Sequence, residues 1–203
     1  FPQKLGQLVK TKLSQELVLM FGYDHQAEPL SDKEIAEIYL DHNLFLKRLS
    51  TLKDCQYLFL GGSDADWLVS LGRVDILAEM VSVARNAGFI PLILCQYASF
   101  IIPKIEAAGV DVEGYAMPLN QEWGWFDRDE CVDIVKSIKK PIIAFRPLAG
   151  GDVKDVRTAL DWLYTNAGVE SILYGATTPI HARETTRTAI EARAASNSTK
   201  PQP

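Results

Sequence analysis

The chain has 203 residues, of which 47% are apolar and 23% are charged, and its formal net charge at pH 7 is -5. These values are typical of a single globular domain. The acidic balance argues against a general nucleic-acid binder, which would need a basic surface.

Two further features bear on where the protein works. No apolar run approaches the roughly 18 residues that a membrane-spanning helix needs, and the first residues, FPQKLGQLVK, lack the apolar core of a secretion signal. Cys55, Cys95 and Cys131 lie in apolar segments and form no CxxC pair, so we expect reduced and mostly buried thiols. These features predict a cytoplasmic protein.

Along the chain, short apolar runs alternate with amphipathic patterns, and each run predicts a strand that is followed by a helix. Ser31 and Glu34 have the spacing of a capping box, which marks the start of the first helix. The predicted strands are 17–23, 57–60, 90–95, 112–117, 142–145 and 171–174, and the predicted helices begin at 31 and then cover 74–86, 99–108, 127–139, 153–166 and 179–194.

Repeated strand–turn–helix units without hairpin signals predict an α/β fold with a parallel sheet. An open doubly wound sheet would carry a Gly-rich phosphate loop after its first strand, and FGYDHQ contains none. We therefore expect a parallel (β/α) TIM-type barrel with about six of its usual eight units. Residues 1–194 would form this single domain, and 195–203 a mobile C-terminal tail.

The segment from Pro141 to Arg183 carries the strongest local pattern. PIIAFRPLAGG and GVESILYGATTPIHARE each run from an apolar strand through a Gly-bearing turn into a helix. The second turn offers hydroxyls and backbone N–H groups at a helix start, which suits an anion. The pattern predicts a binding face at the carboxyl ends of the strands.

These segments resemble the aldo/keto reductase family across nearly the whole chain. IIAFRPLAGG is similar to the family's seventh strand, with Arg146 where the family commonly has Lys, and GVESILYGATTP is similar to the eighth strand and its turn, where the family holds the adenosine phosphate of its dinucleotide. GFIPLILCQYAS, GVDVEGYAMPLN and LFLKRLSTLKDCQYLFLGGSD look like the fifth strand, the sixth strand, and the third helix with the fourth strand. The resemblance implies NADP-linked reduction of a small carbonyl compound.

The same resemblance leaves the reductase chemistry incomplete. On this alignment the family's first two strands are missing, and with them its catalytic Tyr and Asp. The positions of the catalytic Lys and His fall at Gly22 or Tyr23 and at Gly61. Without a proton donor beside the carbonyl, hydride transfer would leave an unprotonated alkoxide. Whether the chain is an enzyme thus stays open.

Candidate site residues are those at the predicted carboxyl ends of strands, which converge on one mouth in a barrel. The resemblance implies cofactor binding by Gln96, Arg146, Gly175, Thr177, Thr178 and Arg183. The remaining mouth candidates are Asp24, His25, Asp64, Asp66, Tyr97, Asn120, Glu122 and Trp123.

Each group has an alternative role. Asp24, His25, Asp64 and Asp66 are suitable metal ligands, although Asp also caps turns. Arg146 ends a buried strand, where it would pair with a phosphate, a substrate carboxylate or a structural carboxylate. Thr177 and Thr178 would bind a phosphate or simply cap a helix that starts with proline. The aromatic residues 123–126 would line a pocket or cover the mouth.

Three functions remain in competition at this stage. The first is a NADP-linked oxidoreductase or a fragment of one. The second is a relative without reductase activity that binds a phosphate-bearing or acidic small molecule at the mouth. The third is a metal-dependent lyase or hydrolase. In each case an incomplete barrel would expose edge strands, so we expect a homodimer or a complementing segment to close it.

Overall fold

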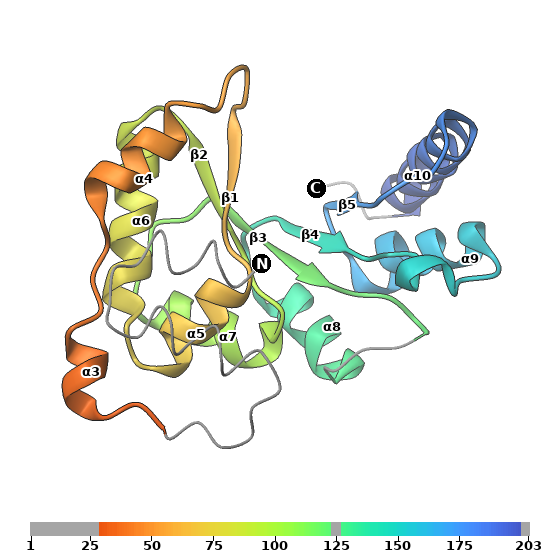
Figure 1. The fold of residues 1–203 in the computed structure, drawn as a ribbon. Coiled ribbons are helices and arrows are strands. Elements are labelled where there is room, and N and C mark those ends of the chain that lie inside the picture. Colours follow the sequence, from red (N-terminus) through yellow and green to blue (C-terminus); the bar gives the residue numbers. More distant parts are fainter. Residues whose placement is uncertain (1–28, 123–126, 200–203) are drawn as a thin grey trace.

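The protein is an open, five-stranded parallel sheet with helices around it (Figure 1), and the computed structural model describes residues 29–122 and 127–199. The strands are β1 (Tyr57–Gly61), β2 (Ile90–Leu94), β3 (Gly114–Pro118), β4 (Ile142–Phe145) and β5 (Ser171–Leu173). They pair in the order of the sequence, and every described pair is parallel. The predicted α/β class with a parallel sheet is thereby confirmed.

The predicted barrel is not closed in the described part of the chain, since β1 and β5 lie at opposite ends of the sheet. Closure of a (β/α) barrel requires about eight strands, and five strands span only part of that circumference. The strand predicted at Leu17–Tyr23 lies outside the described residues.

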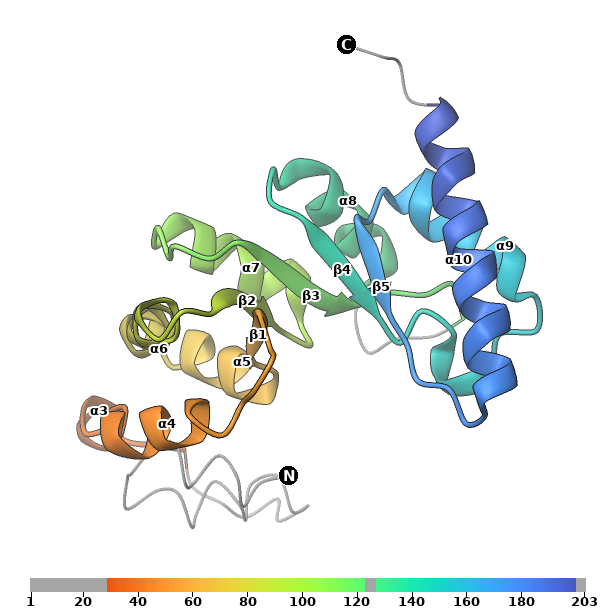
Figure 2. The same cartoon turned by 90° about the horizontal axis from the view of Figure 1, so that it is seen from above.

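The two faces of the sheet differ in burial. Leu60, Ile93 and Tyr115 occupy one row across β1, β2 and β3, and all three pack in the core under the helices. On the opposite face Tyr57 is 60% exposed and Phe59 is 37% exposed. Successive side chains of a strand point to opposite faces. The main apolar cluster therefore lies on the helix-covered face, although the central strand β3 is buried on both faces. Figure 2 shows helices curving around this side.

Each strand leads into one or more helices. The helical segments are α3 (Asp32–Ala36), α4 (His42–Leu49), α5 (Ser63–Ser70), α6 (Val74–Asn86), α7 (Ala98–Ala107), α8 (Arg128–Ser137), the 3-10 turn η1 (Ala149–Gly151), α9 (Val156–Asp161), the π-helical turn η2 (Trp162–Ala167) and α10 (Pro179–Thr199). Among the described residues, no helix combines the length and the apolar character that crossing a bilayer requires. The capping box of Ser31 and Glu34 is confirmed.

Three segments differ from the sequence-based expectation. The helical pattern expected from Ser31 onward divides into α3 and α4, because Asp41 caps a new helix by accepting a hydrogen bond from Leu44 N–H. The helix α5 was not predicted. The last helix continues past Ala194 to Thr199, where a mobile tail was expected, and the buried hydroxyl of Ser196 donates to the carbonyl of Tyr164 at 2.9 Å.

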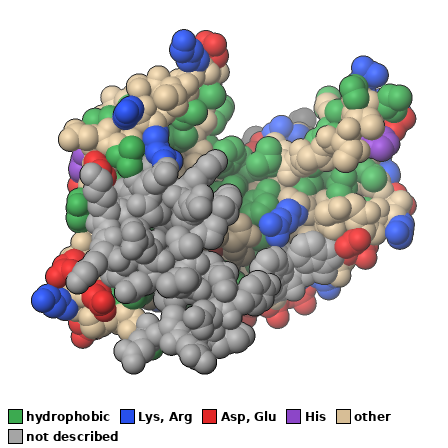
Figure 3. Space-filling view, viewed as in Figure 1, with side chains coloured by type: hydrophobic (Ala, Val, Ile, Leu, Met, Phe, Trp, Pro, Cys, Tyr) green, Lys and Arg blue, Asp and Glu red, His purple; other side chains and the backbone are tan. Residues whose placement is uncertain are grey.

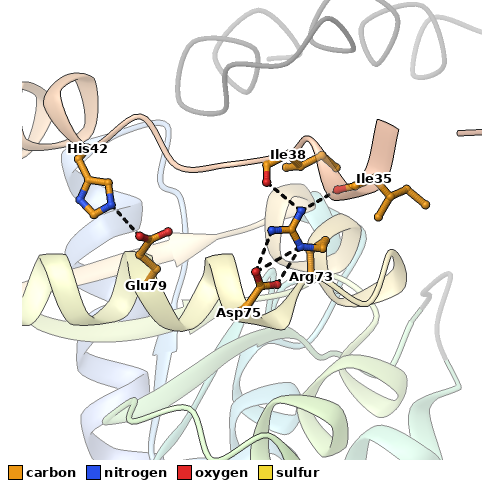
Figure 4. Close-up of polar contacts among 6 residues, drawn as sticks. All are labelled: Ile35, Ile38, His42, Arg73, Asp75 and Glu79. Atoms are coloured by element: carbon orange, nitrogen blue, oxygen red, sulfur yellow. Dashed lines mark hydrogen bonds and ion pairs between the residues drawn. The ribbon is translucent and has the colours of Figure 1, made fainter. Parts of the chain in front are cut away.

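Arg73 ties the segment α3–α4 to the start of α6 (Figure 4). Its guanidinium donates from Nη1 to the carbonyl oxygens of Ile35 and Ile38 at 2.6 and 2.8 Å. From Nε and Nη2 it also donates to the carboxylate of Asp75 at 2.9 and 2.8 Å. One residue therefore satisfies two carbonyls at the end of α3 and fixes the direction in which the chain enters α4.

Replacement of Arg73 by alanine should lower the free energy of unfolding by about 2 kcal/mol, since it leaves part-buried carbonyls without a charged donor. Urea unfolding followed by circular dichroism measures this change. Arg187→Ala, at an exposed position of α10, is the matched control and should change stability by less than about 0.5 kcal/mol. Equal effects of the two variants would contradict the role of Arg73.

Candidate functional site

The carboxyl ends of the strands carry the candidate site, and Asp66 joins two of them. Asp66 lies in the first turn of α5, directly after β1, and its side chain is buried. Its carboxylate accepts hydrogen bonds from the backbone N–H of Gln96 at 2.8 Å and of Tyr97 at 3.4 Å, just beyond β2. Sequence reasoning considered Asp66 as a metal ligand or a turn-capping residue. In the structure Asp66 accepts backbone hydrogen bonds, as a capping residue does, but the donors follow β2 and are not in its own turn.

Burial changes the acidity of both aspartates. It raises the pKa of Asp64 to about 6, with a further contribution from the negative charge of Asp66. Burial also raises the pKa of Asp66 to about 6, although the N–H groups of Gln96 and Tyr97 oppose this rise. The turn after β1 therefore holds two carboxyl groups, Asp64 and Asp66, whose pKa values of about 6 lie close to neutral pH. Groups of this kind are suited to acid–base chemistry.

The turn before α5 depends on a glycine. Gly61 has φ of 93°, and a Cβ added there would lie 2.5 Å from Cβ of Ala65 and 2.9 Å from the carbonyl oxygen of Leu94. The close approach lets α5 begin immediately against the end of β2. From the sequence, Gly61-Gly62 predicts the end of a strand. The helix α5 that begins directly after these glycines was not predicted.

Asn120 and Arg146 form a second contact on the same edge. The side-chain amide of Asn120, at the end of β3, donates from Nδ2 to the backbone carbonyl of Arg146 at 3.2 Å. Its Oδ1 accepts from the N–H of Glu122 at 3.0 Å. Asn120 is 2% exposed, so this amide is part of the packed edge, and it is Arg146 that faces outward.

Arg146 has an unusual backbone. Its φ is 54°, in the left-handed region that costs a non-glycine residue about 1 kcal/mol. The bond from Asn120 and a hydrogen bond from the N–H of Ala149 at 3.0 Å hold its carbonyl in place. The expectation that its guanidinium would be buried at a strand end is wrong, because Arg146 is exposed, with its guanidinium 5.9 Å from the ring centre of Phe145.

The predicted anion-binding turn lies after β5 and is exposed from Gly175 to His181. Thr178 accepts the N–H of His181 at 3.1 Å, as an N-terminal cap does, and Thr177 contacts the His181 ring at 3.2 Å. Thr178 therefore already satisfies one backbone donor of α10. Arg183 is exposed one turn further along the helix, and a Cβ at Gly175 would meet no atom within 4 Å.

Some sequence candidates are not described by the structure. Asp24, His25 and Trp123, with the rest of the aromatic segment 123–126, lie outside the described residues. Within the described residues, no group of three or more His, Cys, Asp or Glu side chains is arranged to hold a metal ion. Of the four residues considered for a metal site, the structure therefore describes only Asp64 and Asp66.

The cysteines are only in part as expected. Cys95 and Cys131 are buried, and burial raises the pKa of both thiols, that of Cys131 to about 11. Cys55, by contrast, is exposed just before β1, so the expectation of a buried thiol is wrong there. Its position in the segment leading to an edge strand leaves it outside the helix-covered core.

Comparison with known proteins does not assign the chain to a family. No protein-family model matches the chain, and no curated protein matches it. A solved structure that matches is the crystal structure of the Amycolatopsis orientalis BexX/CysO complex, with 15% sequence identity and a TM-score of 0.42. The match covers 64% of this chain and 53% of that chain, so the chain spans about half of the protein it matches.

These findings correct the resemblance drawn from the sequence. The expected membership of the aldo/keto reductase family is wrong, since no family model matches the chain. The strand–turn–helix segments that suggested the family are real, but such units occur in many α/β proteins and do not identify one family.

The raised pKa values of Asp64 and Asp66 predict a dependence of stability on pH. A carboxyl whose pKa rises on folding binds more protons in the folded state, so its contribution becomes unfavourable as pH increases from about 4 to about 6. Asp64→Asn should therefore stabilise the protein at pH 7.5, by about 1–2 kcal/mol, and have little effect near pH 4. Urea unfolding at both pH values measures the difference. The exposed Asp133→Asn is the control, and a pH-independent effect of Asp64→Asn would contradict the assignment.

The two glycines Gly61 and Gly72 allow a matched test of the α5 turn. Gly72 also has a positive φ, of 74°, but a Cβ there would meet no atom within 4 Å. Gly72→Ala should cost about 1 kcal/mol through backbone strain alone. Gly61→Ala should cost at least about 2 kcal/mol more, because Ala65 and the backbone of Leu94 must also move. Thermal and urea unfolding of both variants would show equal losses if the close approach were unimportant.

Proposed function

We propose that this protein binds a phosphate-bearing or acidic small molecule at the carboxyl edge of its sheet, with Arg146 as the main contact. The observation that carries the proposal is the left-handed backbone of Arg146, an exposed residue whose carbonyl is held by Asn120. A glycine would adopt this conformation without strain. An arginine in its place suggests that the guanidinium is needed, and guanidinium groups bind phosphates and carboxylates through paired hydrogen bonds.

The neighbouring strand supports an anionic ligand. β5 pairs with β4, with Leu173 opposite Phe145, so the turn after β5 follows the same edge as Arg146. That turn presents the exposed hydroxyl of Thr177 and leads to Arg183 on α10. Because the N–H of His181 is already bonded to Thr178, this turn would add polar contacts to Arg146 and would not form an anion site by itself.

The β1 end of the edge carries two carboxyl groups that are suited to acid–base chemistry. Asp64 is the better candidate of the two carboxyls, since Asp66 is engaged with the N–H groups of Gln96 and Tyr97. A carboxyl with a pKa of about 6 exchanges a proton readily near neutral pH. Because β2 and β3 lie between β1 and β4, Asp64 and Arg146 are about three strand spacings, roughly 14 Å, apart. Proton transfer by Asp64 would therefore require a ligand long enough to extend along the sheet edge from Arg146.

Three earlier expectations continue as part of this proposal. NADP is one phosphate-bearing ligand to test, now without the support of a family assignment. A barrel-type arrangement is in keeping with β3, which is buried on both faces, as the strands of a filled barrel are. A cytoplasmic location is consistent with free thiols at Cys55, Cys95 and Cys131.

Isothermal titration calorimetry with NADPH, inorganic pyrophosphate and citrate tests the ligand class. Arg146→Ala should weaken binding of the responsive probe about 10- to 100-fold, as expected for loss of a charged bidentate contact. Arg146→Gly should weaken it equally, while raising the free energy of unfolding by up to about 1 kcal/mol, because glycine relieves the strain.

Arg187→Ala serves as the control for the loss of one positive charge. It should leave binding within about twofold of the unmodified protein, since screening limits the effect of a distant exposed charge. Binding that persists in Arg146→Ala, or no binding of any probe at millimolar concentration, would contradict the proposed function.

A further inference from the structure

The helix α7 begins without a capping side chain of its own. Its N-cap residue is Tyr97, which makes no capping hydrogen bond with its side chain. The first N–H groups of a helix have no partners inside the helix. Because Ala98, the first helical residue, is buried, donors left without an acceptor here would cost free energy. The start of α7 therefore requires acceptors from other parts of the chain.

Side chains from two neighbouring helices supply these acceptors. Asp66 of α5 accepts hydrogen bonds from the N–H groups of Gln96 and Tyr97 at 2.8 and 3.4 Å. The N–H of Ser99 forms a hydrogen bond with the side chain of Cys131 on α8. Both α5 and α8 contact α7, and Figure 1 shows α5 beside it. The segment that leaves β2 and enters α7 is thus held from outside, and Asp66 is the acceptor that can carry a full charge at neutral pH.

The strength of this contact depends on whether Asp66 is ionised. Both of its oxygens are used, since Gln96 N–H lies 3.1 Å from Oδ1 and 2.8 Å from Oδ2, and Tyr97 N–H lies 3.4 Å from Oδ1. An ionised carboxylate accepts at both oxygens, whereas a protonated one turns one oxygen into a donor. Hydrogen bonds to a charged acceptor are also about twice as strong as neutral ones. Protonation therefore weakens the attachment of both N–H groups.

Among the described residues, Asp64 on α5 and the thiol of Cys95 after β2 are the titratable groups whose charges couple to Asp66. The elements that pack on α5 are α6, α7 and β1. In β1 the ionisable residue is Tyr57, at the opposite end of the strand. Acidic and basic side chains are interspersed on the face shown in Figure 3. The charged residues of α6 and α7 have partners elsewhere: Asp75 with Arg73, Glu79 with His42 (Figure 4), Arg85 with Glu113, Lys104 over the ring of Phe100, and Glu106 with Lys140.

We propose that Asp66 is a positioning residue that fixes Gln96 and Tyr97 at the carboxyl edge of the sheet when it is ionised and loosens them when it is protonated. Both residues follow β2 directly, so the shape of the edge between β2 and α7 would change with pH. Because no ligand takes part, this role of Asp66 is independent of the proposed function.

The local effect of ionisation is opposite in sign to its effect on the whole fold. Burial raises the pKa of Asp66 to about 6, so the carboxylate predominates at neutral pH and the acid predominates below pH 5. Since the pKa is raised on folding, the charged form is the less favourable one for overall stability. Increasing pH should therefore tighten the start of α7 while the contribution of Asp66 to the free energy of unfolding decreases. A purely structural carboxylate would not separate these two effects.

An NMR titration of the full chain, from below pH 5 to above pH 7, tests the proposal without a ligand. The amide protons of Gln96 and Tyr97 should move downfield together with the Cγ resonance of Asp66, with a shared midpoint near pH 6. Their protection factors against hydrogen exchange should rise about tenfold or more over this range, as expected for a hydrogen bond to a charged group. The amide of Leu119, which donates to the carbonyl of Phe145, is the control and should show no such transition.

Three variants assign the transition to one carboxyl group. Asp66→Asn keeps the size of the side chain but cannot ionise, so the two amides should lose their pH dependence. Asp64→Asn should keep the transition, and the exposed Asp133→Asn should leave it unchanged. A transition that persists in Asp66→Asn, or that disappears in Asp64→Asn, would overturn the proposal. If Asp66→Asn does not fold, the unmodified chain still decides, because titration of Asp66 Cγ without movement of the two amides would equally overturn it.

Discussion

The one-sided packing of a parallel sheet governs this structure. Backbone hydrogen bonds join the strands edge to edge, but the free energy gained from burial comes mainly from one face, where Leu60, Ile93 and Tyr115 lie under the helices. Parallel sheets are usually covered on both faces or closed on themselves. Here β3 is buried on both faces, whereas Tyr57 and Phe59 of the edge strand β1 are exposed on the face away from the helices.

The ionisable side chains at the carboxyl edge of the sheet differ in their burial from one end to the other. At the β1–β2 end, Asp64 and Asp66 are partly or wholly withdrawn from water, and their carboxyl groups hold protons more tightly than exposed ones do. Beyond β4 and β5 the exposed charged residues include Arg146 and Arg183, and also Asp152 and Glu184.

Much of the fold could be predicted from the sequence because it depends on local patterns. The strand Ile142–Phe145 and the helix Val74–Asn86 have the predicted bounds, since a short apolar run and a long 3.6-residue period are both unambiguous. The helix α5 was missed because its eight residues follow two glycines, which sequence reasoning took only as a break. Family membership failed for a different reason, since Gly-bearing turns after strands are common to many β/α proteins.

The site could be predicted as a set of positions but not as a set of roles. Strand ends identified Asp66, Asn120 and Arg146, because parallel strands bring these ends to one edge. The roles follow from contacts between distant residues, such as Asn120 with the carbonyl of Arg146, 26 positions away in the sequence. The spacing of residues in the sequence does not predict a hydrogen bond between positions so far apart. The strained backbone of Arg146 is equally invisible in the sequence, where nothing marks it as different from an ordinary strand-end arginine.

The strictly sequential order of the strands has a consequence for how the chain assembles. Every described strand pair joins neighbours in the sequence, so each new β/α unit finds its docking surface on the unit made just before it. Contacts of this kind close short loops, which favours rapid folding. The growing chain can therefore add units one at a time as it leaves the ribosome, and an incomplete product would end in an ordered sheet edge.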